Sequence, residues 1–492
     1  MWQIAKFCAI FFVSIWLGTA AKADQEYPFV ADPAATQQTF EGWGMSLAWY
    51  GNTIFPGKGV ISDWAHWNSY METLYSPQEL GFNIVRYNIG GGENPAFQYL
   101  FANNAAFPNM NYMIQGFANS AGVYDWTADQ GQVLMMKKAK ELGANIFEAF
   151  SNSPPYFWLK SGSVTGAKRP DPKDPTSSGD YDNLLDEHYD DFANYLATVV
   201  KYFHDVEGID FRTLDPLNEP SPETMYWLYP QDYPTGKVQE GCHFNINHQI
   251  KMLNATYAAL KAKGVSTQVS ASDDTGIDYT IASYNGYDQL TRSMAVSQIN
   301  THSYIDGNRQ NLRALAARDG KRLWMSEFGT NDKGLNGAIE FAKNIRNDIK
   351  DLGAQAWIIW QPDWGLLDFT GVDQVSYRKQ FYAMKQYSHF IRPGYQILTN
   401  TDWGTITAYD PKSGNLVFVT LNVGSNSAWI NGDITAFGKS ESVAHVYVTD
   451  ANNSMAAMPD LPIVNGHVRY NVGNHSITTV VISTQPKKGD AL

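Results

Sequence analysis

The stretch EGIDFRTLDPLNEP, residues 207–220, carries the pattern from which the fold can be inferred. Upstream of it, apolar residues recur at helical spacing and form one stripe, at Phe192, Tyr195, Leu196, Val199, Val200 and Phe203. Gly208 then provides the left-handed position that commonly ends a helix. An apolar run follows at once and stops at Pro220. The pattern predicts a helix that leads directly into a buried strand.

The same unit, a helix that ends at glycine and then an apolar run, recurs along residues 38–361. The glycines at these joints are Gly81, Gly143, Gly208, Gly264, Gly320 and Gly353. Further runs over 38–47 and 296–304 complete a set of eight strands. Near-continuous apolar runs are typical of parallel strands that are buried on both faces. We therefore predict an α/β fold with a (β/α)8 TIM barrel over residues 38–392, with a doubly wound open sheet as the alternative.

The pattern changes after Trp364, where short alternating strands replace the helix and strand units. Pro411–Gly414 and Asn465–Gly466 are typical hairpin turns between such strands. Residues 393–492 are therefore expected to form an appended antiparallel β-sandwich domain. Residues 24–37 form an N-terminal segment that we expect to join the same β-sandwich.

The first 23 residues have the pattern of an export signal. Lys6 precedes an apolar run over 7–19, and Ala21-Lys22-Ala23 fits the small-residue rule for cleavage. The run is shorter than the roughly 20 residues that cross a bilayer. We predict a secreted or periplasmic protein, cleaved after Ala23, with no membrane partner after signal removal. Cys242 is then the only cysteine left, so no intramolecular disulfide can form. As a separate expectation, we predict a monomer.

Composition bears on the class of ligand. The formal net charge is −13, and no cluster of Lys and Arg stands out, so we expect no nucleic-acid partner. Aromatic residues make up 14% of the chain, which supplies a large core and also the flat apolar faces on which sugar rings stack. A polysaccharide or oligosaccharide substrate is compatible with both features.

In a β/α barrel the active site lies at the carboxyl ends of the strands. The polar and aromatic residues that end the predicted strands are Arg86, Asn88, Glu148, Ser151, Asn152, Asn218, Glu219, Asp273, Asp274, His302, Tyr304, Glu327, Trp360 and Gln361. Glu219 and Glu327 each follow an apolar run, where a carboxylate is costly unless it is paired or used. The structural alternative is a buried glutamate satisfied by Arg86.

Two carboxylates at matching strand ends are the parts of a glycosidase. One carboxyl donates a proton to the leaving oxygen while the other is ionised. Carboxyl groups about 5–5.5 Å apart retain the configuration of the sugar, and about 6.5–9.5 Å implies inversion. The sequence leaves this separation open.

Several motifs together resemble glycoside hydrolase family 30. They are residues 41–44 (EGWG), 83–92 (NIVRYNIGGG), 148–156 (EAFSNSPPY), 218–220 (NEP), 239–242 (QEGC) and 326–329 (SEFG). These blocks are more similar to the endo-β-1,6-galactanase branch than to the glucosylceramidase or glucuronoxylanase branches. The resemblance spans nearly the whole mature chain.

The resemblance implies a secreted retaining hydrolase of β-1,6-galactan, such as arabinogalactan side chains, that needs no cofactor or metal. Glu219 would be the acid/base and Glu327 the nucleophile. Asn218 would bind the sugar's 2-hydroxyl, and Trp360 would lie under the sugar ring. Arg86 and Tyr304 would hold and orient the Glu327 carboxylate, with His302 nearby. Further subsite candidates are Asn152, Trp43 and Glu240, for which core packing of Trp43 or a salt bridge of Glu240 is the alternative.

Other readings remain open. Another family 30 activity, namely a β-glucosidase or glucosylceramidase, a β-1,6-glucanase or a xylanase, would use the same carboxylates, and a non-catalytic carbohydrate-binding protein is a further alternative. Residues 44–48 (GMSLA) miss the final glycine of a serine-hydrolase elbow, and Gly90–Gly92 lacks the spacing of a phosphate loop. Asp273 and Asp274 could bind a cation, cap a helix or make hydrogen bonds at the rim.

Overall fold

The computed structural model describes residues 26–92, 94–95, 114–168, 181–221, 228–229 and 239–484. The expected signal peptide, residues 1–23, lies outside these ranges. Among the described residues, no helix is long and apolar enough to cross a membrane.

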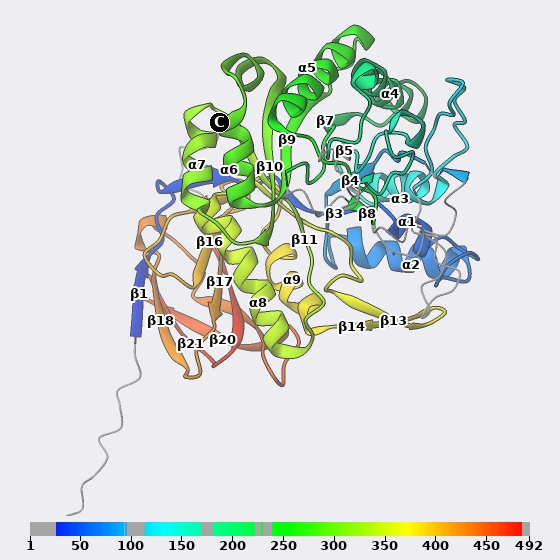
Figure 1. Cartoon of the computed structure of the whole chain (residues 1–492). Coiled ribbons are helices and arrows are strands. Elements are labelled where there is room, and N and C mark those ends of the chain that lie inside the picture. The colour runs from blue at the N-terminus through cyan, green and yellow to red at the C-terminus, as the bar shows by residue number, and fades with distance from the viewer. Residues whose placement is uncertain are drawn as a thin grey trace, which may run out of the picture.

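Eight parallel strands close into a barrel in the order β10-β11-β12-β3-β4-β5-β7-β9 (Figure 1). Their bounds are β3 (Gly42–Ser46), β4 (Ile84–Asn88), β5 (Ile146–Phe150), β7 (Phe211–Asp215), β9 (Gln268–Gly276), β10 (Val296–Ile305), β11 (Arg322–Phe328) and β12 (Ala356–Ile359). Every strand lies within one of the predicted apolar runs or overlaps it. The TIM barrel is confirmed, and the alternative of an open sheet is wrong, because β12 pairs with β3 and closes the ring.

Helices surround this barrel. They are α1 (Tyr50–Thr53), α2 (Trp64–Tyr75), α3 (Gln130–Glu141), α4 (Tyr189–Tyr202), α5 (Ile246–Lys263), α6 (Ile277–Gly286), α7 (Arg309–Arg318), α8 (Gly334–Asn347) and α9 (Lys379–Ser388). Gly264 ends α5 at φ 69°, and Gly208 has φ 64° after the turn that extends α4, so both occupy the left-handed region as predicted. A residue with a Cβ is disfavoured there, which is why glycine occupies these two positions.

Alternate residues of each barrel strand face the interior and the helices. At the amino-terminal end of the barrel a small apolar cluster contains Ile84, Trp324, Ala356 and Ile358. A much larger apolar cluster lies mostly between strands and helices and includes Trp43, Tyr387 and Phe341. The polar residues that end the strands are therefore held on a closely packed support.

The second part of the fold is a curled sheet in the order β1-β18-β21-β20-β19-β22-β17-β16-β15-β2. Its strands are β1 (Glu26–Val30), β2 (Thr36–Thr39), β15 (Gln396–Leu398), β16 (Thr405–Tyr409), β17 (Asn415–Asn422), β18 (Ala428–Asp433), β19 (Val443–Thr449), β20 (Ala456–Val464), β21 (His467–Val472) and β22 (Ser476–Ser483). The expected β-sandwich domain is confirmed, with one exception. The β1–β18 pair is parallel, whereas its neighbours are antiparallel.

Helices α8 and α9 lie between the barrel and this sheet (Figure 1). The Gln386 side chain donates to Thr449 Oγ1 at 3.0 Å, and Thr479 Oγ1 donates to the Gln386 backbone oxygen at 3.2 Å. Two further strand pairs lie outside the barrel and the large sheet: β6 (Ala167–Lys168) with β8 (Leu228–Tyr229), and the hairpin of β13 (Leu367–Gly371) and β14 (Gln374–Tyr377).

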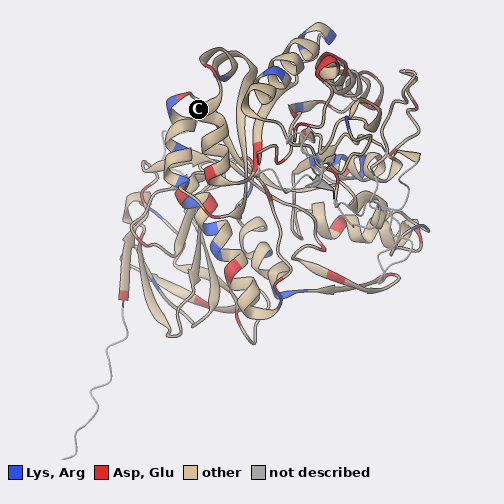
Figure 2. Ribbon diagram, viewed as in Figure 1, with Lys and Arg blue, Asp and Glu red and all other residues tan. Residues whose placement is uncertain are grey.

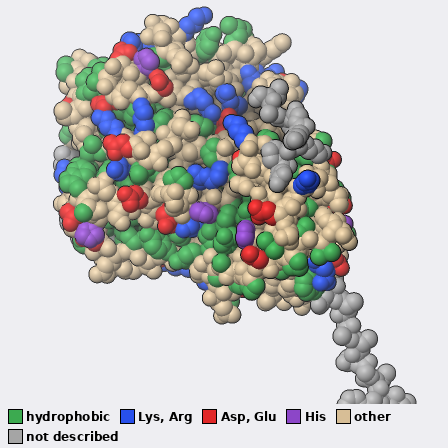
Figure 3. All heavy atoms as spheres, turned by 180° about the vertical axis from the view of Figure 1, so that it is seen from behind, with side chains coloured by type: hydrophobic (Ala, Val, Ile, Leu, Met, Phe, Trp, Pro, Cys, Tyr) green, Lys and Arg blue, Asp and Glu red, His purple; other side chains and the backbone are tan. Residues whose placement is uncertain are grey.

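Charged residues of both signs are interspersed along the helices (Figure 2). On α8, for example, Lys343 and Glu340 form an ion pair of 3.1 Å. The face turned away from the viewer in Figure 1 also mixes acidic, basic and apolar side chains (Figure 3).

Candidate active site

The two glutamates singled out in the sequence meet at the carboxyl end of the barrel. Glu327 lies in β11, and Glu219 follows β7. The backbone of Glu219 is left-handed, with φ 49°, and its N–H donates to the backbone oxygen of Asp273 at 2.9 Å, which fixes this conformation. Their exposed fractions are 5% and 3%. One carboxylate oxygen of each and a ring nitrogen of His302 all lie within 4.8 Å of one another. This distance between the nearest oxygens is compatible with the separation of about 5–5.5 Å between the carboxyl groups of a retaining pair.

Arg86, on β4, is the buried cation of the site. Its Nη1 donates to Glu327 Oε2 at 2.9 Å, its Nε donates to Glu148 Oε1 at 3.2 Å, and its Nη2 contacts Asp273. The guanidinium also lies 3.8 Å from the ring centroid of Phe150. Burial lowers the pKa of Arg86, but Asp273, Glu327 and Glu148 outweigh this and raise it. Arg86 therefore stays charged and orients Glu327 through a fixed planar group.

Glu148, on β5, is the glutamate that fits the structural alternative. Besides Arg86 it accepts hydrogen bonds from four side chains, those of Thr213, Ser270, Gln298 and Asn300, at 2.6–3.3 Å. A carboxylate with all its acceptor sites used in this way has a supporting role. No contact of this kind joins Arg86 to Glu219 among the described residues.

His302, on β10, lies between the acidic groups. Its Nδ1 is 3.2 Å from Glu219 Oε1 and 3.7 Å from Glu327 Oε1, and its Nε2 is 3.1 Å from Asp273 Oδ1. Burial lowers the pKa of His302, but Glu327 and Asp273 outweigh burial and hold the pKa well above 6.5. The imidazole is thus a cation with both N–H groups directed at carboxylates.

Asp273 is the residue whose role the sequence did not reveal. It accepts from Ser326 Oγ at 2.6 Å and contacts both Arg86 and His302. Burial raises the pKa of Asp273, but Arg86 and His302 outweigh burial and lower it. The feature of the sequence that could have indicated this role is the position of Asp273 at the end of a predicted strand. It does not cap a helix, because α6 begins after Gly276.

Asp274 holds the chain beyond Glu219 in place, which agrees with the expected hydrogen bonds at the rim. Its carboxylate accepts from the Ser221 N–H at 3.1 Å and from the hydroxyls of Ser272 and Ser283 at 2.7 and 2.8 Å. Burial raises the pKa of Asp274 to about 6.

Glu327 has a perturbed pKa. Burial raises the pKa of its carboxyl and the neighbouring Glu219 adds to this, whereas His302 and Arg86 lower it, and the net result is a pKa of about 7. Tyr304 donates its hydroxyl to Glu327 Oε1 at 3.1 Å. Two carboxyls this close resist joint ionisation, so the pair can share one proton. Such a pair can deliver a proton and also attack a carbon atom.

Trp360 follows β12 and packs in a separate apolar cluster with Ala48, Trp49, Ile114 and Phe150. Its ring meets Trp49 edge-on, with centroids 5.4 Å apart. This cluster lies at the end of the barrel where the carboxylates meet, because Phe150 also contacts Arg86.

Asn218 and Asn152 lie on the same end, and their exposed fractions are 4% and 3%. The Oδ1 atoms of both amides accept no hydrogen bond from the residues that the structure describes. A buried amide oxygen without a donor is costly, and a ligand hydroxyl can supply that donor.

One sequence candidate, Trp43, lies away from the carboxylates. Trp43 is fully buried, donates its Nε1 to the Ile391 oxygen at 2.7 Å and packs against Tyr387 of α9. Its side chain therefore faces the helices, and core packing is the correct alternative. Glu240 is fully buried. The N–H of the next residue, Gly241, donates to the backbone oxygen of Val164 at 2.8 Å.

Ligand atoms of Glu219, His302 and Glu327 are close enough together for a cation. The residues around them argue against such a site. Both ring nitrogens of His302 face carboxylates, which raise the pKa of the imidazole, and Arg86 already contacts Glu327, so positive charge is supplied from within the barrel.

Residues 28–373 match the model of O-glycosyl hydrolase family 30. The chain is 32% identical to an endo-β-1,6-galactanase of Hypocrea rufa over 82% of this chain and 83% of that protein. It is 24% identical to an exo-β-1,6-galactobiohydrolase of Bifidobacterium longum subsp. longum, over 86% of this chain and 36% of that protein.

Among solved structures, a family 30 subfamily 8 xylanase from Clostridium acetobutylicum superposes with a TM-score of 0.69. It is 22% identical, and the match covers 93% of this chain and 100% of the xylanase. At this identity the likeness concerns the fold. The matched family model and the galactanase relative confirm the resemblance noted in the sequence, and the protein is a glycosidase. The chain belongs to O-glycosyl hydrolase family 30.

Proposed function

We propose that this glycosidase cleaves β-1,6-linked galactan, such as arabinogalactan side chains, with retention of configuration. The observation that carries the mechanism is the approach of Glu219 and Glu327, since one carboxylate oxygen of each lies within 4.8 Å of the other. The choice of galactan is supported by the 32% identity to an endo-β-1,6-galactanase.

In the first step, ionised Glu327 attacks the anomeric carbon, and protonated Glu219 donates to the leaving oxygen. The bond from the anomeric carbon to that oxygen breaks as a glycosyl ester forms on Glu327. Arg86 and Tyr304 hold one Glu327 oxygen each, so the attacking carboxylate cannot rotate freely.

In the second step, Glu219, now ionised, takes a proton from water as the water attacks the same carbon. The ester bond breaks, Glu327 leaves as a carboxylate, and the sugar regains its original configuration. His302 contacts Glu219 and lies close to Glu327, so its positive charge stabilises whichever carboxylate is ionised.

The sugar ring lies on Trp360, and its hydroxyls satisfy buried amides. Asn218, next to Glu219, accepts from the 2-hydroxyl, and Asn152 accepts from a second hydroxyl.

We also propose that the protein is exported, cleaved after Ala23 and active as a monomer.

The test is product analysis of the mature enzyme on β-1,6-galactan, β-1,6-glucan, glucuronoxylan and an aryl β-glucoside, with Glu219→Gln and Glu327→Gln in parallel. We expect galacto-oligosaccharides with the β-anomer formed first, and loss of products in both variants. Cleavage of another polymer instead would keep the mechanism and refute the substrate. Binding without cleavage by the wild type would favour a carbohydrate-binding protein.

A further inference from the structure

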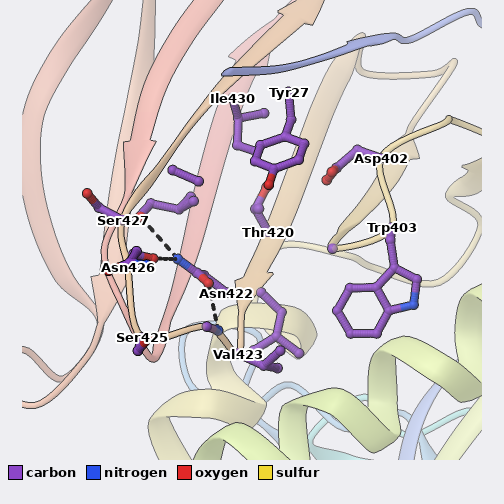
Figure 4. Close-up of a pocket in the computed structure, with 15 residues that line it drawn as sticks. Tyr27, Asp402, Trp403, Thr420, Asn422, Val423, Ser425, Asn426, Ser427 and Ile430 are labelled. Carbon is purple, nitrogen blue, oxygen red and sulfur yellow. Dashed lines mark hydrogen bonds between the residues drawn. The ribbon is translucent and has the colours of Figure 1, made fainter. Parts of the chain in front are cut away.

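A hollow of about 720 Å³ lies on the curled sheet, between β1, the end of β17, the start of β18 and the loop at Asp402 (Figure 4). Its volume falls within the range of about 300–1,000 Å³ that small-molecule sites occupy. Two aromatic side chains, Tyr27 and Trp403, line it and are 39% and 47% exposed. It shares no lining residue with the carboxylate site of the barrel.

Trp403 is held rigidly by the barrel helix α8. The Arg346 guanidinium lies 4.3 Å from the ring centroid of Trp403, and Arg346 Nε donates to the Trp403 backbone oxygen at 2.6 Å. Lys350 also binds this loop, donating to Asn400 Oδ1 at 2.8 Å and to the Thr405 oxygen at 3.0 Å. A fixed indole that is still nearly half exposed binds a flat ligand at little cost in entropy.

The opposite wall is a polar turn over residues 423–427 (Figure 4). The Asn422 side chain holds the turn, since it donates to the Asn426 oxygen at 2.9 Å and accepts from the Gly424 N–H at 2.8 Å. The side chains of Ser425 and Asn426 are exposed and offer both donors and acceptors.

We propose that this hollow is a second saccharide-binding site, which holds a neutral stretch of the polymer that the barrel cleaves. Trp403 and Tyr27 receive the apolar faces of sugar rings, and the turn and Asp402 bind their hydroxyls. No Lys or Arg is among the described residues that line the hollow, and Asp402 repels anions, so a phosphate or sulfate ester does not fit. The identity of the polymer rests on the proposed function.

The test measures binding of soluble β-1,6-galactan by affinity electrophoresis, in a Glu327→Gln background that prevents cleavage. We expect Trp403→Ala to weaken binding roughly tenfold. The matched control is Trp64→Ala, which removes an indole that is 50% exposed on α2 and lies outside the hollow, and which we expect to leave the affinity unchanged. Tyr27→Ala, which leaves the contact between Trp403 and Arg346 intact, provides a second variant should Trp403→Ala fold poorly.

Unchanged affinity in both hollow variants would overturn the second site and leave the proposed function untouched. The same series on β-1,6-glucan and glucuronoxylan separates the two ideas. If the enzyme cleaves one of these instead, weaker binding of that polymer by Trp403→Ala supports the second site although the proposed substrate is refuted.

Discussion

His302 Nδ1 lies 3.2 Å from Glu219 Oε1, and the same ring nitrogen is 3.7 Å from Glu327 Oε1. One cation thus faces both carboxyls of the candidate active site. Asp273 fixes the other ring nitrogen at 3.1 Å, so the imidazole cannot turn away. The charge of His302 should therefore control the pH at which the pair works.

We expect His302→Asn to move the acid limb of the kcat/KM profile to higher pH. The pKa of Glu327 is about 7 with His302 present, and the His302 cation lowers it, so loss of the cation lets this pKa rise further. Because ionised Glu327 is the active form, activity falls as the pH drops through its pKa. The variant should therefore lose more activity at pH 6 than at pH 8.

The control for this experiment is His445→Asn, on β19, where the side chain is 51% exposed and pairs with Asp460 at 2.8 Å. Its profile should match that of the wild type. An acid limb at the wild-type pH in His302→Asn would show that the His302 charge does not act on Glu327.

The two glutamates should respond differently to azide. In Glu219→Ala we expect a loss of about 10²–10⁴ in kcat/KM on galactan, and a smaller loss on a nitrophenyl glycoside whose leaving group needs no acid. Azide then attacks the glycosyl-enzyme and yields the β-azide. In Glu327→Ala, azide attacks the anomeric carbon from the face that Glu327 occupied and yields the α-glycosyl azide.

Chemical analysis of the azide products decides this prediction. The same anomer from both variants would contradict the assignment of roles, and exchanged anomers would mean that the roles of acid/base and nucleophile are reversed.

Arg86→Met should destabilise the fold by about 3–5 kcal/mol, because it leaves buried carboxylates without their cation. Arg86 faces Asp273, Glu327 and Glu148, whose folded-state pKa values rise when it is lost. A carboxyl whose pKa is higher in the folded than in the unfolded state lowers the free energy of unfolding once the pH exceeds its unfolded-state pKa. The loss of stability in Arg86→Met should therefore grow between pH 4 and pH 8. Urea unfolding at several pH values measures it.

Arg318→Met is the comparison for Arg86. Arg318 is 50% exposed and pairs with Asp319 at the surface, where solvent screens the pair, so its loss should change the free energy of unfolding little. A deficit in Arg86→Met that did not vary with pH would contradict the electrostatic explanation.

Trp43 and Trp360 should separate stability from catalysis. Trp43→Ala removes a side chain packed between β3 and α9 and should cost about 3–5 kcal/mol of folding free energy, with KM unchanged. Trp360→Ala should raise KM or lower kcat on galactan, because the proposed sugar platform is lost. Denaturant unfolding and steady-state kinetics on both variants test this, and an unchanged kcat/KM in Trp360→Ala would exclude it as the platform.

Fewer of the strands of the curled sheet than of the barrel could be predicted from the sequence. The three-residue strand β15 is too short to show alternation, and β18 ends in Asn431-Gly432-Asp433, which has the composition of a turn. The parallel β1–β18 pair joins segments about 400 residues apart, and no local pattern encodes such a pairing. The signal peptide and its cleavage after Ala23 remain predictions.

The amino-acid sequence was sufficient to predict the order of strands and helices, the barrel class, and the two glutamates at strand ends. Periodicity, glycine at helix ends and the cost of a carboxylate in an apolar run are all local properties. Which charged side chains contact one another depends on how the chain folds. Asp273 lies under Arg86 and His302, Glu148 is satisfied by five donors, and Trp43 faces the helices. Closure of the barrel sets these contacts, because it brings together side chains that are more than 180 residues apart, as Arg86 and Asp273 are.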